Sequence, residues 1–241
     1  MISKIHKSWA PLKNLFYKEP LSSFHGHLAN ISFQPKKEDI FNVFQMPLNE
    51  VRVVILGQDP YPIPGDAMGY AYATRKPSMP EVLKIIAQEI TQEEGLEKIF
   101  LEESTSHPWQ SLQHWRDQGV FLLNTALTVE TGRAGSHLNA WKQFTIETIK
   151  YLSHQKGVIW LLWGKKAQDF IPYIANAFNA GKYSREEMDD IPAVDSYNYI
   201  IACPHPAAEA YASGKAGFFG SDCFYTANRV LLNLKSPEIF W

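Results

Sequence analysis

The segment Val51-Arg-Val-Val-Ile-Leu56, followed directly by Gly57-Gln-Asp-Pro-Tyr-Pro62, is the clearest indication of the fold of this chain. Five of the first six residues are apolar and most of these are β-branched, which predicts a strand buried on both faces. The second six cannot extend that strand, because the glycine permits a sharp turn and the two prolines lack backbone N–H groups. We therefore expect a rigid loop at the carboxyl end of this strand, which is where ligands bind in open parallel sheets.

Three other short segments have the same buried character and are predicted to be strands. They are Gly119-Val-Phe-Leu-Leu-Asn124, Gly157-Val-Ile-Trp-Leu-Leu162 and Tyr199-Ile-Ile-Ala-Cys203. The segments between and after them favour helices, predicted over residues 81–94, 109–118, 139–155, after Lys166 to about Phe178, and near 221–234. This alternation predicts an α/β fold: a three-layer αβα sandwich with a central four-stranded parallel sheet.

The remaining segments carry weaker signals. Two groups of apolar residues near the amino terminus predict helix faces: Trp9, Leu12, Leu15 and Phe16, then Ile40, Phe41, Val43 and Phe44. The segment 181–198 is polar and aperiodic, which indicates a surface excursion. The acidic segment 96–106 gives no clear assignment.

Length and composition narrow the class of protein. The chain has 241 residues with 45% hydrophobic content and no shift in composition, so we expect residues 1–241 to form a single domain. Its formal net charge of -2 means that any nucleic acid would be held by local patches and shape. Two cysteines are too few for a disulfide framework or a zinc site. Without a signal peptide or a membrane-spanning apolar run, the sequence predicts a soluble cytoplasmic protein with no membrane partner.

Polar side chains follow the predicted strands. Right-handed crossovers place the carboxyl ends of parallel strands at one edge of a sheet. We therefore expect Asp59, Asn124, Lys165 and His205 to converge there, which brings a carboxylate, an amide, an ammonium and an imidazole around one cleft. These residue types alone do not name a reaction.

Three motifs in this order carry a specific resemblance. Gly57-Gln-Asp-Pro-Tyr61, Leu122-Leu-Asn124, and Cys203-Pro-His-Pro206 with Gly217-Phe-Phe-Gly220 together resemble the family 1 uracil-DNA glycosylases, and the similarity extends from about Ile31 to Leu232. The resemblance implies hydrolysis of the N-glycosidic bond of uracil in DNA after base flipping, which initiates base excision repair. It implies single- or double-stranded uracil-containing DNA as partner, no metal or other cofactor, a monomer, and possible recognition by DNA-mimic inhibitor proteins.

The resemblance also assigns catalytic roles. Asp59 would hold the attacking water and stabilise the cationic sugar, although an aspartate that caps a turn is the simpler interpretation of this residue alone. His205 would donate a hydrogen bond to uracil O2 as the base becomes anionic, whereas a histidine in a loop is more often solvated or structural.

Four further residues would contact the base. Asn124 would read N3-H and O4 of uracil, which cytosine does not match, or it simply forms an Asx turn. The ring of Tyr61 would exclude the 5-methyl group of thymine, which a merely structural tyrosine would not do. Gln58 would offer mainly backbone contacts. Tyr72 stands where the family usually has a phenylalanine that stacks on the base, so its hydroxyl needs a partner.

The candidate DNA-binding residues combine family positions with departures from the family pattern. They are Lys76, Pro77, Ser78, Gly164, Lys165, Pro206, Ala207, Tyr211 and Lys215. Lys165 replaces a serine, and Ala207-Ala-Glu-Ala210 replaces a Ser-Pro-Leu-Ser segment whose leucine fills the gap left by the flipped base. Because a glutamate is unsuited to that gap, we expect either Tyr211 to fill it or a longer loop with Lys215 to grip the backbone. Solvated surface lysines are the simpler alternative for each lysine alone.

Other functions stay open at this point. The altered pocket and loop are compatible with removal of a different damaged base, but Tyr61 and Asn124 argue against it. A DNA-binding protein without efficient turnover would explain the missing serines and leucine, while Asp59 and His205 argue against it. A small-molecule α/β enzyme would require the three motifs to coincide by chance.

Overall fold

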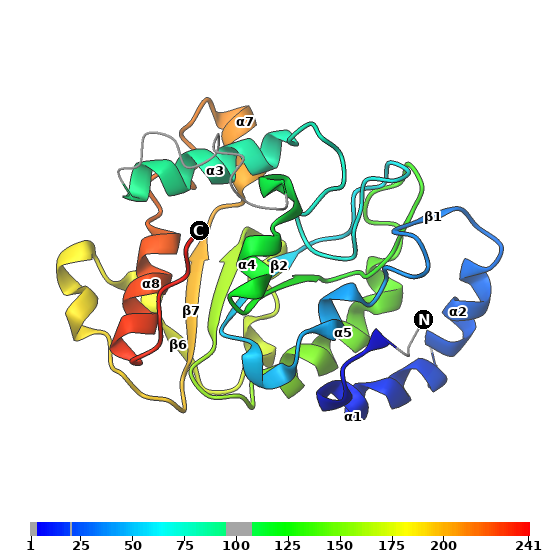
Figure 1. Cartoon of the computed structure of the whole chain (residues 1–241), viewed down its shortest axis with the longest axis horizontal. Helices are drawn as coiled ribbons and strands as arrows, with labels where there is room; N and C mark the ends of the chain where they lie inside the picture. Colours follow the sequence, from blue (N-terminus) through cyan, green and yellow to red (C-terminus); the bar gives the residue numbers. More distant parts are fainter. Residues whose placement is uncertain (1–3, 20, 95–107) are drawn as a thin grey trace.

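The computed structural model describes residues 4–19, 21–94 and 108–241. Its centre is a parallel sheet of five strands in the order β3-β2-β5-β7-β6, flanked by helices (Figure 1). The strands are β2 (Val53–Gly57), β3 (Val120–Asn124), β5 (Ile159–Trp163), β6 (Ala177–Asn179) and β7 (Asn198–Cys203). The predicted α/β sandwich and its four buried strands are confirmed, but the predicted number of strands is wrong.

The additional strand, β6, lies where the sequence predicted the end of a long helix. That helix stops early: α6 covers only Lys165–Gln168, and a 3-10 turn, η7 (Ile171–Tyr173), follows it. Pro172 lies within η7 and cannot continue a helix. The edge strand carries one large apolar side chain, Phe178, whose ring stacks on Tyr197 at 5.2 Å. The three residues of β6 are exposed or half-buried, so the sequence has no run of apolar residues here that would predict a strand.

Successive strand residues point to opposite faces of the sheet, and each face has its own core. On one face, residues such as Ile55 and Leu161 pack with α3 (Glu81–Glu94), α4 (Gln113–Asp117) and α8 (Cys223–Asn233). On the other, residues such as Leu56 and Trp160 pack with α1 (Ala10–Lys13) and α5 (Leu138–Leu152). Figure 1 shows these helix layers on either side of the strands.

Several predicted helices are shorter or broken in the structure. The amino-terminal face is divided among η2 (Lys7–Trp9), α1 and η3 (Asn14–Tyr17), and the second face is a turn with η4 (Asn42–Gln45). The predicted helix over 109–118 is split into η6 (Trp109–Ser111) and α4 at Leu112, whose φ is 51°. The acidic segment 96–106 lies outside the described residues.

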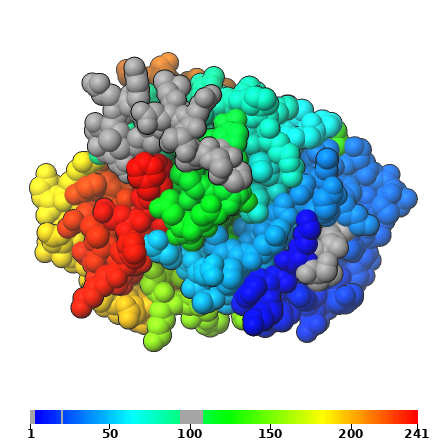
Figure 2. Space-filling view, in the orientation of Figure 1, coloured from blue at the N-terminus to red at the C-terminus, as the bar shows by residue number. Residues whose placement is uncertain are grey.

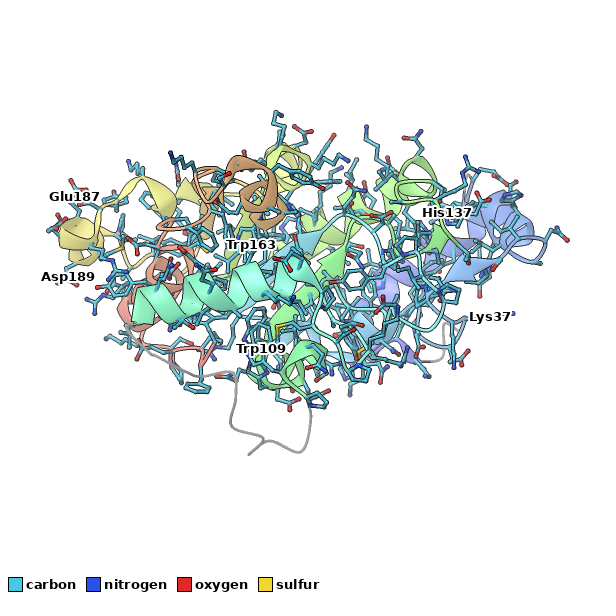
Figure 3. The ribbon with its side chains drawn as sticks, turned by 90° about the horizontal axis from the view of Figure 1, so that it is seen from above. Lys37, Trp109, His137, Trp163, Glu187 and Asp189 are labelled. Carbon is cyan, nitrogen blue, oxygen red and sulfur yellow. The ribbon has the colours of Figure 1, made fainter. Side chains whose placement is uncertain are left out.

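The remaining elements are short. They are α2 (Leu21–Leu28), η5 (Leu48–Glu50), η8 (Ala180–Lys182), η9 (Arg185–Asp190), η10 (Pro206–Ala208), α7 (Glu209–Ala212), and the antiparallel pair β1 (Phe33–Gln34) and β4 (Val129–Glu130). The segment 181–198 is more than a surface excursion, because Met188 and Ile191 are buried. Figure 3 labels Glu187 and Asp189 of η9 at one end of the molecule, opposite Lys37 and His137.

The carboxyl-terminal segment lies against α4. The ring of Trp241 packs edge-on to Trp115 at 5.4 Å, and the side chain of Gln118 donates to the carbonyl of Phe240 at 2.8 Å. Figure 2 shows the red carboxyl-terminal atoms beside the green atoms of this region. Among the residues that the structure describes, none of the helices combines the length and apolar character needed to cross a membrane.

The strand order indicates where a ligand would bind. From β2 the chain passes to β3 on one side and later returns to β5 on the other side of β2. A crevice forms at the carboxyl ends of the strands where the direction of winding reverses in this way. The loops after β2 and β5 therefore lie at the expected position of a site.

Candidate active site

The loop after β2 is fixed to the loop after β3 by three hydrogen bonds. The carbonyl of Gly57 accepts from the backbone N–H of Thr125 at 2.9 Å. The carbonyl of Gln58 accepts from the backbone N–H of Ala126 at 3.0 Å and from Oγ1 of Thr125 at 2.8 Å. These bonds extend the pairing of Gly57 with Asn124, so the two loops form one rigid unit.

Gly57 is required for the position of Asn124. A Cβ atom at residue 57 would lie 2.5 Å from Oδ1 of Asn124 and 2.8 Å from Cβ of Ala71. The amide of Asn124 therefore packs directly against the glycine, and Asn124 is only 5% exposed. Any larger residue would push the amide away from the end of β3.

Both carboxylate oxygens of Asp59 are held by the protein. The backbone N–H of Gly135 donates to Oδ2 at 2.5 Å, and Nε2 of Gln58 donates to Oδ1 at 2.9 Å. A carboxylate that accepts hydrogen bonds on both oxygens has one preferred orientation. It retains lone pairs that can accept a hydrogen bond from a water molecule.

The side chain of Gln58 also connects Asp59 to a cation. Its Oε1 accepts from Nζ of Lys166 at 2.5 Å, while its Nε2 reaches Asp59. The sequence predicted mainly backbone contacts for Gln58 and no contact between its side chain and Lys166. No local signal could have found this contact, because the two residues are 108 positions apart in the chain.

His205 is arranged to be a neutral hydrogen-bond donor. Its Nδ1 accepts from the backbone N–H of Ala207 at 3.1 Å, so the neutral ring carries its proton on Nε2. Burial, and second the nearby charge of Lys166, lower the pKa of His205 below its usual 6.5. Gly164, at φ 79°, makes room for the ring, since a Cβ there would lie 2.7 Å from Cβ of His205.

The two tyrosines are coupled to each other and to His205. The hydroxyl of Tyr61 donates to the carbonyl of Tyr72 at 2.9 Å, which fixes its ring. The Tyr72 ring packs 5.3 Å from that of Trp163, which Figure 3 labels near the centre of the view. The Tyr72 hydroxyl finds its partners in Nε2 of His205, at 3.3 Å, and the carbonyl of Leu56, at 3.5 Å. Burial raises the pKa of both phenols.

All six residues predicted for catalysis and base recognition line one cavity of about 280 Å³. They are Gln58, Asp59, Tyr61, Tyr72, Asn124 and His205. A neighbouring hollow of about 300 Å³ shares Gln58, Tyr72 and His205 with this cavity and extends to Gly164, Lys165 and Lys166. The arrangement combines a fixed carboxylate with a neutral donor, an amide and aromatic rings, as hydrolysis of a bond to a planar base requires.

A family comparison agrees with this geometry. Residues 44–232 match the model of the uracil DNA glycosylase superfamily. The chain belongs to this superfamily. The uracil-DNA glycosylase of Yersinia pestis (strain Pestoides F) is 35% identical over 218 residues, covering 88% of this chain and 82% of the relative. The enzyme of that name from Yersinia pseudotuberculosis serotype I (strain IP32953) gives the same values.

Solved structures of the superfamily share the fold. The crystal structure of mimivirus uracil-DNA glycosylase matches with a TM-score of 0.73 and 24% identity, covering 99% of this chain and 88% of that chain. Its Y322L variant in complex with UGI matches with a TM-score of 0.75 and 23% identity, covering 99% and 89%. The wild-type UNG structure from Nitratifractor salsuginis matches with a TM-score of 0.57 and 19% identity, covering 95% and 93%.

The candidate DNA-binding residues of this superfamily member are dispersed around the cavity. Gly164 and Lys165 line the neighbouring hollow, and Ala207 lines the cavity itself, while Pro206 is buried. Ser78, Tyr211 and Lys215 are exposed. The carbonyls of Lys76 and Pro77 accept from Nε2 of Gln110 at 3.1 and 3.2 Å, which holds the proline-flanked loop.

Two of the candidate lysines already have carboxylate partners. Nζ of Lys76 lies 3.3 Å from the buried carboxylate of Asp66, and Nζ of Lys165 pairs with Asp169. Within the described residues, Lys215 has no ion-pair partner. Of these three lysines, Lys215 is therefore the one whose charge is most available to a phosphate.

Glu209 is a structural anchor rather than a protruding side chain. It is 3% exposed, and its carboxylate accepts from the backbone N–H groups of Ala216 (2.9 Å), Phe218 (2.6 Å) and Phe219 (3.0 Å). Burial opposes its ionisation, but these N–H groups together outweigh that effect and lower the pKa of Glu209. The sequence did not predict this anchor, which closes residues 209–219 into a compact loop.

Proposed function

We propose that this chain removes uracil from DNA by hydrolysing its N-glycosidic bond after base flipping, the first step of base excision repair. The observation that carries the proposal is that Asp59, Asn124 and His205 line one cavity at the carboxyl ends of parallel strands. Membership of the superfamily and the names of the Yersinia relatives support it.

Asp59 and His205 stabilise the two charges that develop during the reaction. Cleavage of a glycosidic bond builds positive charge on the sugar and negative charge on the departing base. The fixed Asp59 carboxylate stabilises the sugar and accepts a proton from the attacking water. The Nε2–H of neutral His205 donates to uracil O2, and a preorganised donor of this kind contributes about 3 kcal/mol.

Asn124, Tyr61 and Tyr72 select the base. The Asn124 amide accepts from N3-H and donates to O4, and cytosine would leave this buried amide mismatched. The Tyr61 ring, fixed by its bond to the Tyr72 carbonyl, collides with a 5-methyl group and excludes thymine. The Tyr72 ring stacks on the base, backed by Trp163.

Tyr211 fills the gap in the duplex. Its side chain is 91% exposed on α7, and the Glu209 anchor fixes the loop beneath it. An exposed aromatic ring on a rigid turn can insert between base pairs and hold the flipped state. Lys215, on the same loop, contacts the phosphate backbone and makes binding sensitive to salt.

Release of uracil from single- and double-stranded oligonucleotides that contain one deoxyuridine tests the proposal. We expect the wild type to release uracil but not thymine or cytosine, and Asp59→Asn and His205→Ala to lower kcat by about 10²–10³-fold. His154→Ala, at an exposed histidine near the amino end of β5, is the matched control and should be unaffected. Failure of the wild type to release uracil from either form would reject the proposal.

Further expectations concern partners and location. A DNA-mimic inhibitor protein is a proposed partner, supported by the mimivirus structures that are described as complexes with UGI. A single domain over 1–241, a monomeric state and a cytoplasmic location stay predictions.

A further inference from the structure

A groove of about 290 Å³ lies beside the proposed active site and has no role in the mechanism above. Its walls come from α5 on one side and from α6 with η7 on the other. The residues that matter here are Gln58, Leu138, Lys142, Lys166, Phe170 and Tyr173.

The groove is continuous with the active site. Gln58 lines both the groove and the cavity that contains Asp59, and Lys166 lines both the groove and the adjoining hollow. The bond between Nζ of Lys166 and Oε1 of Gln58 marks the boundary. A strand that leaves the active site on this side would enter the groove next.

The inner surface of the groove is apolar and aromatic. Leu138, Phe170 and Tyr173 are half-buried and pack against the core below them. The rings of Phe170 and Tyr173 lie 6.2 Å apart at 54°, so they do not cover each other face to face. Aromatic side chains that line a groove can stack with nucleobases of any sequence.

The rim carries available positive charge. Lys142 is exposed and has no ion-pair partner within the described residues, and Lys166 contacts only the neutral amide of Gln58. The acidic residue of the groove, Asp169, is paired with Lys165. Two cations above an apolar surface complement a phosphate attached to a base.

We propose that this groove binds an unpaired nucleotide of the strand that contains the flipped uridine, with its base against Phe170 and Tyr173 and its phosphate between Lys142 and Lys166. This inference rests on the proposed action on DNA. A paired base cannot present its face to the groove, so the subsite favours single-stranded substrates. It adds to the grip of Lys215 and Tyr211 without involving the duplex.

Steady-state kinetics on single-stranded oligonucleotides test the subsite. The substrates carry one deoxyuridine and zero to five further nucleotides on either its 5′ or its 3′ side. We expect the wild-type KM to fall by roughly tenfold at one length on one side, as one base enters the groove. Lys142→Ala and Tyr173→Ala should abolish that fall and leave kcat on the shortest substrate unchanged.

Two controls separate the base contact from the phosphate contact. With an abasic nucleotide at the decisive position, Tyr173→Ala should behave like the wild type, while Lys142→Ala should still raise KM. Lys142→Ala should also reduce the slope of log affinity against log salt by about 0.7. Lys156→Ala, at an exposed lysine before β5, should change neither quantity.

The outcomes distinguish the subsite from the activity. If the wild type releases uracil but Lys142→Ala and Tyr173→Ala follow its length dependence throughout, the groove does not bind DNA and the inference is wrong. If the wild type releases no uracil, the proposed activity fails. In that case, fluorescence anisotropy with a uracil-free oligothymidylate tests the groove directly. Lys142→Ala should bind this oligonucleotide more weakly than the wild type. Equal affinity of the two proteins would overturn the inference.

Discussion

The hydroxyl oxygen of Tyr72 lies 3.3 Å from Nε2 of His205. Because Nδ1 of this histidine accepts from the backbone N–H of Ala207, Nε2 carries the proton of the neutral ring and donates a hydrogen bond to the Tyr72 hydroxyl oxygen. The hydroxyl in turn donates toward the carbonyl of Leu56 at 3.5 Å. The donor proposed for uracil O2 is therefore occupied before substrate binds.

Replacement of Tyr72 by phenylalanine should release this donor. Tyr72→Phe keeps the ring that packs on Trp163 and removes only the competing acceptor. Since a neutral hydrogen bond contributes about 1 kcal/mol net, we expect kcat for uracil release to rise about fivefold. Tyr61→Phe, which removes a hydroxyl that does not contact His205, should give no such gain. A tenfold fall in kcat for Tyr72→Phe would mean that the hydroxyl assists the reaction.

The pH dependence of the reaction should report Lys166. The charge of Lys166 is the second cause, after burial, of the lowered pKa of His205. The ring is active when neutral, so activity is lost as the pH falls through this lowered pKa. Lys166→Met removes the charge and should shift the acid limb of the pH profile of kcat/KM toward higher pH. Lys165→Met is the control, because that ammonium pairs with Asp169; an equal shift in both variants would exclude a specific effect of Lys166.

The sequence predicted the centre of the molecule better than its edges. The four buried strands have runs of apolar residues that the pattern identifies directly, because both faces of each strand are covered. β6 was missed since a three-residue edge strand with one large apolar residue has no period. The prediction of a helix that ends at Phe178 is wrong because Pro172 interrupts it. The prediction did not take this proline into account.

The candidate site likewise has features that the sequence predicted and features that it missed. The convergence of Asp59, Asn124 and His205 on one cavity was predicted, because each belongs to a motif at a strand end and parallel strands bring those ends together. The contact of Lys166 with Gln58 and the anchoring of Glu209 were missed, because both depend on the folded path of loops. Neither leaves a periodic or compositional trace in the sequence.

Glu209 should stabilise the fold through its charge. Glu209→Gln keeps the size of the side chain but weakens the bonds from Ala216, Phe218 and Phe219, so we expect a loss of about 2 kcal/mol in the free energy of unfolding. The pKa of Glu209 is lowered from 4.5, so its contribution is complete above that pH and is lost as the pH falls through the lower, folded value.

Urea denaturation at several pH values measures this effect. The difference between wild type and Glu209→Gln should be constant near neutral pH and should shrink in acid. Glu186→Gln, at an exposed glutamate of η9, should match the wild type throughout. A variant with unchanged stability at pH 7 would mean that the loop does not depend on the ionised carboxylate.

Tyr211 should matter only when a duplex must be opened. The ring is 91% exposed and packs on nothing that its removal would disturb, so Tyr211→Ala should fold normally. If the ring fills the gap left by the uridine, its loss should lower release from double strands about tenfold or more, because unstacking costs a few kcal/mol per step. Release from single strands should change little, since no gap forms there.

Tyr17→Ala, at a tyrosine that is 75% exposed, is the matched control. Equal losses on both substrates would instead place Tyr211 in contact with the strand itself, and no loss on either would assign the opening of the duplex to another part of the loop.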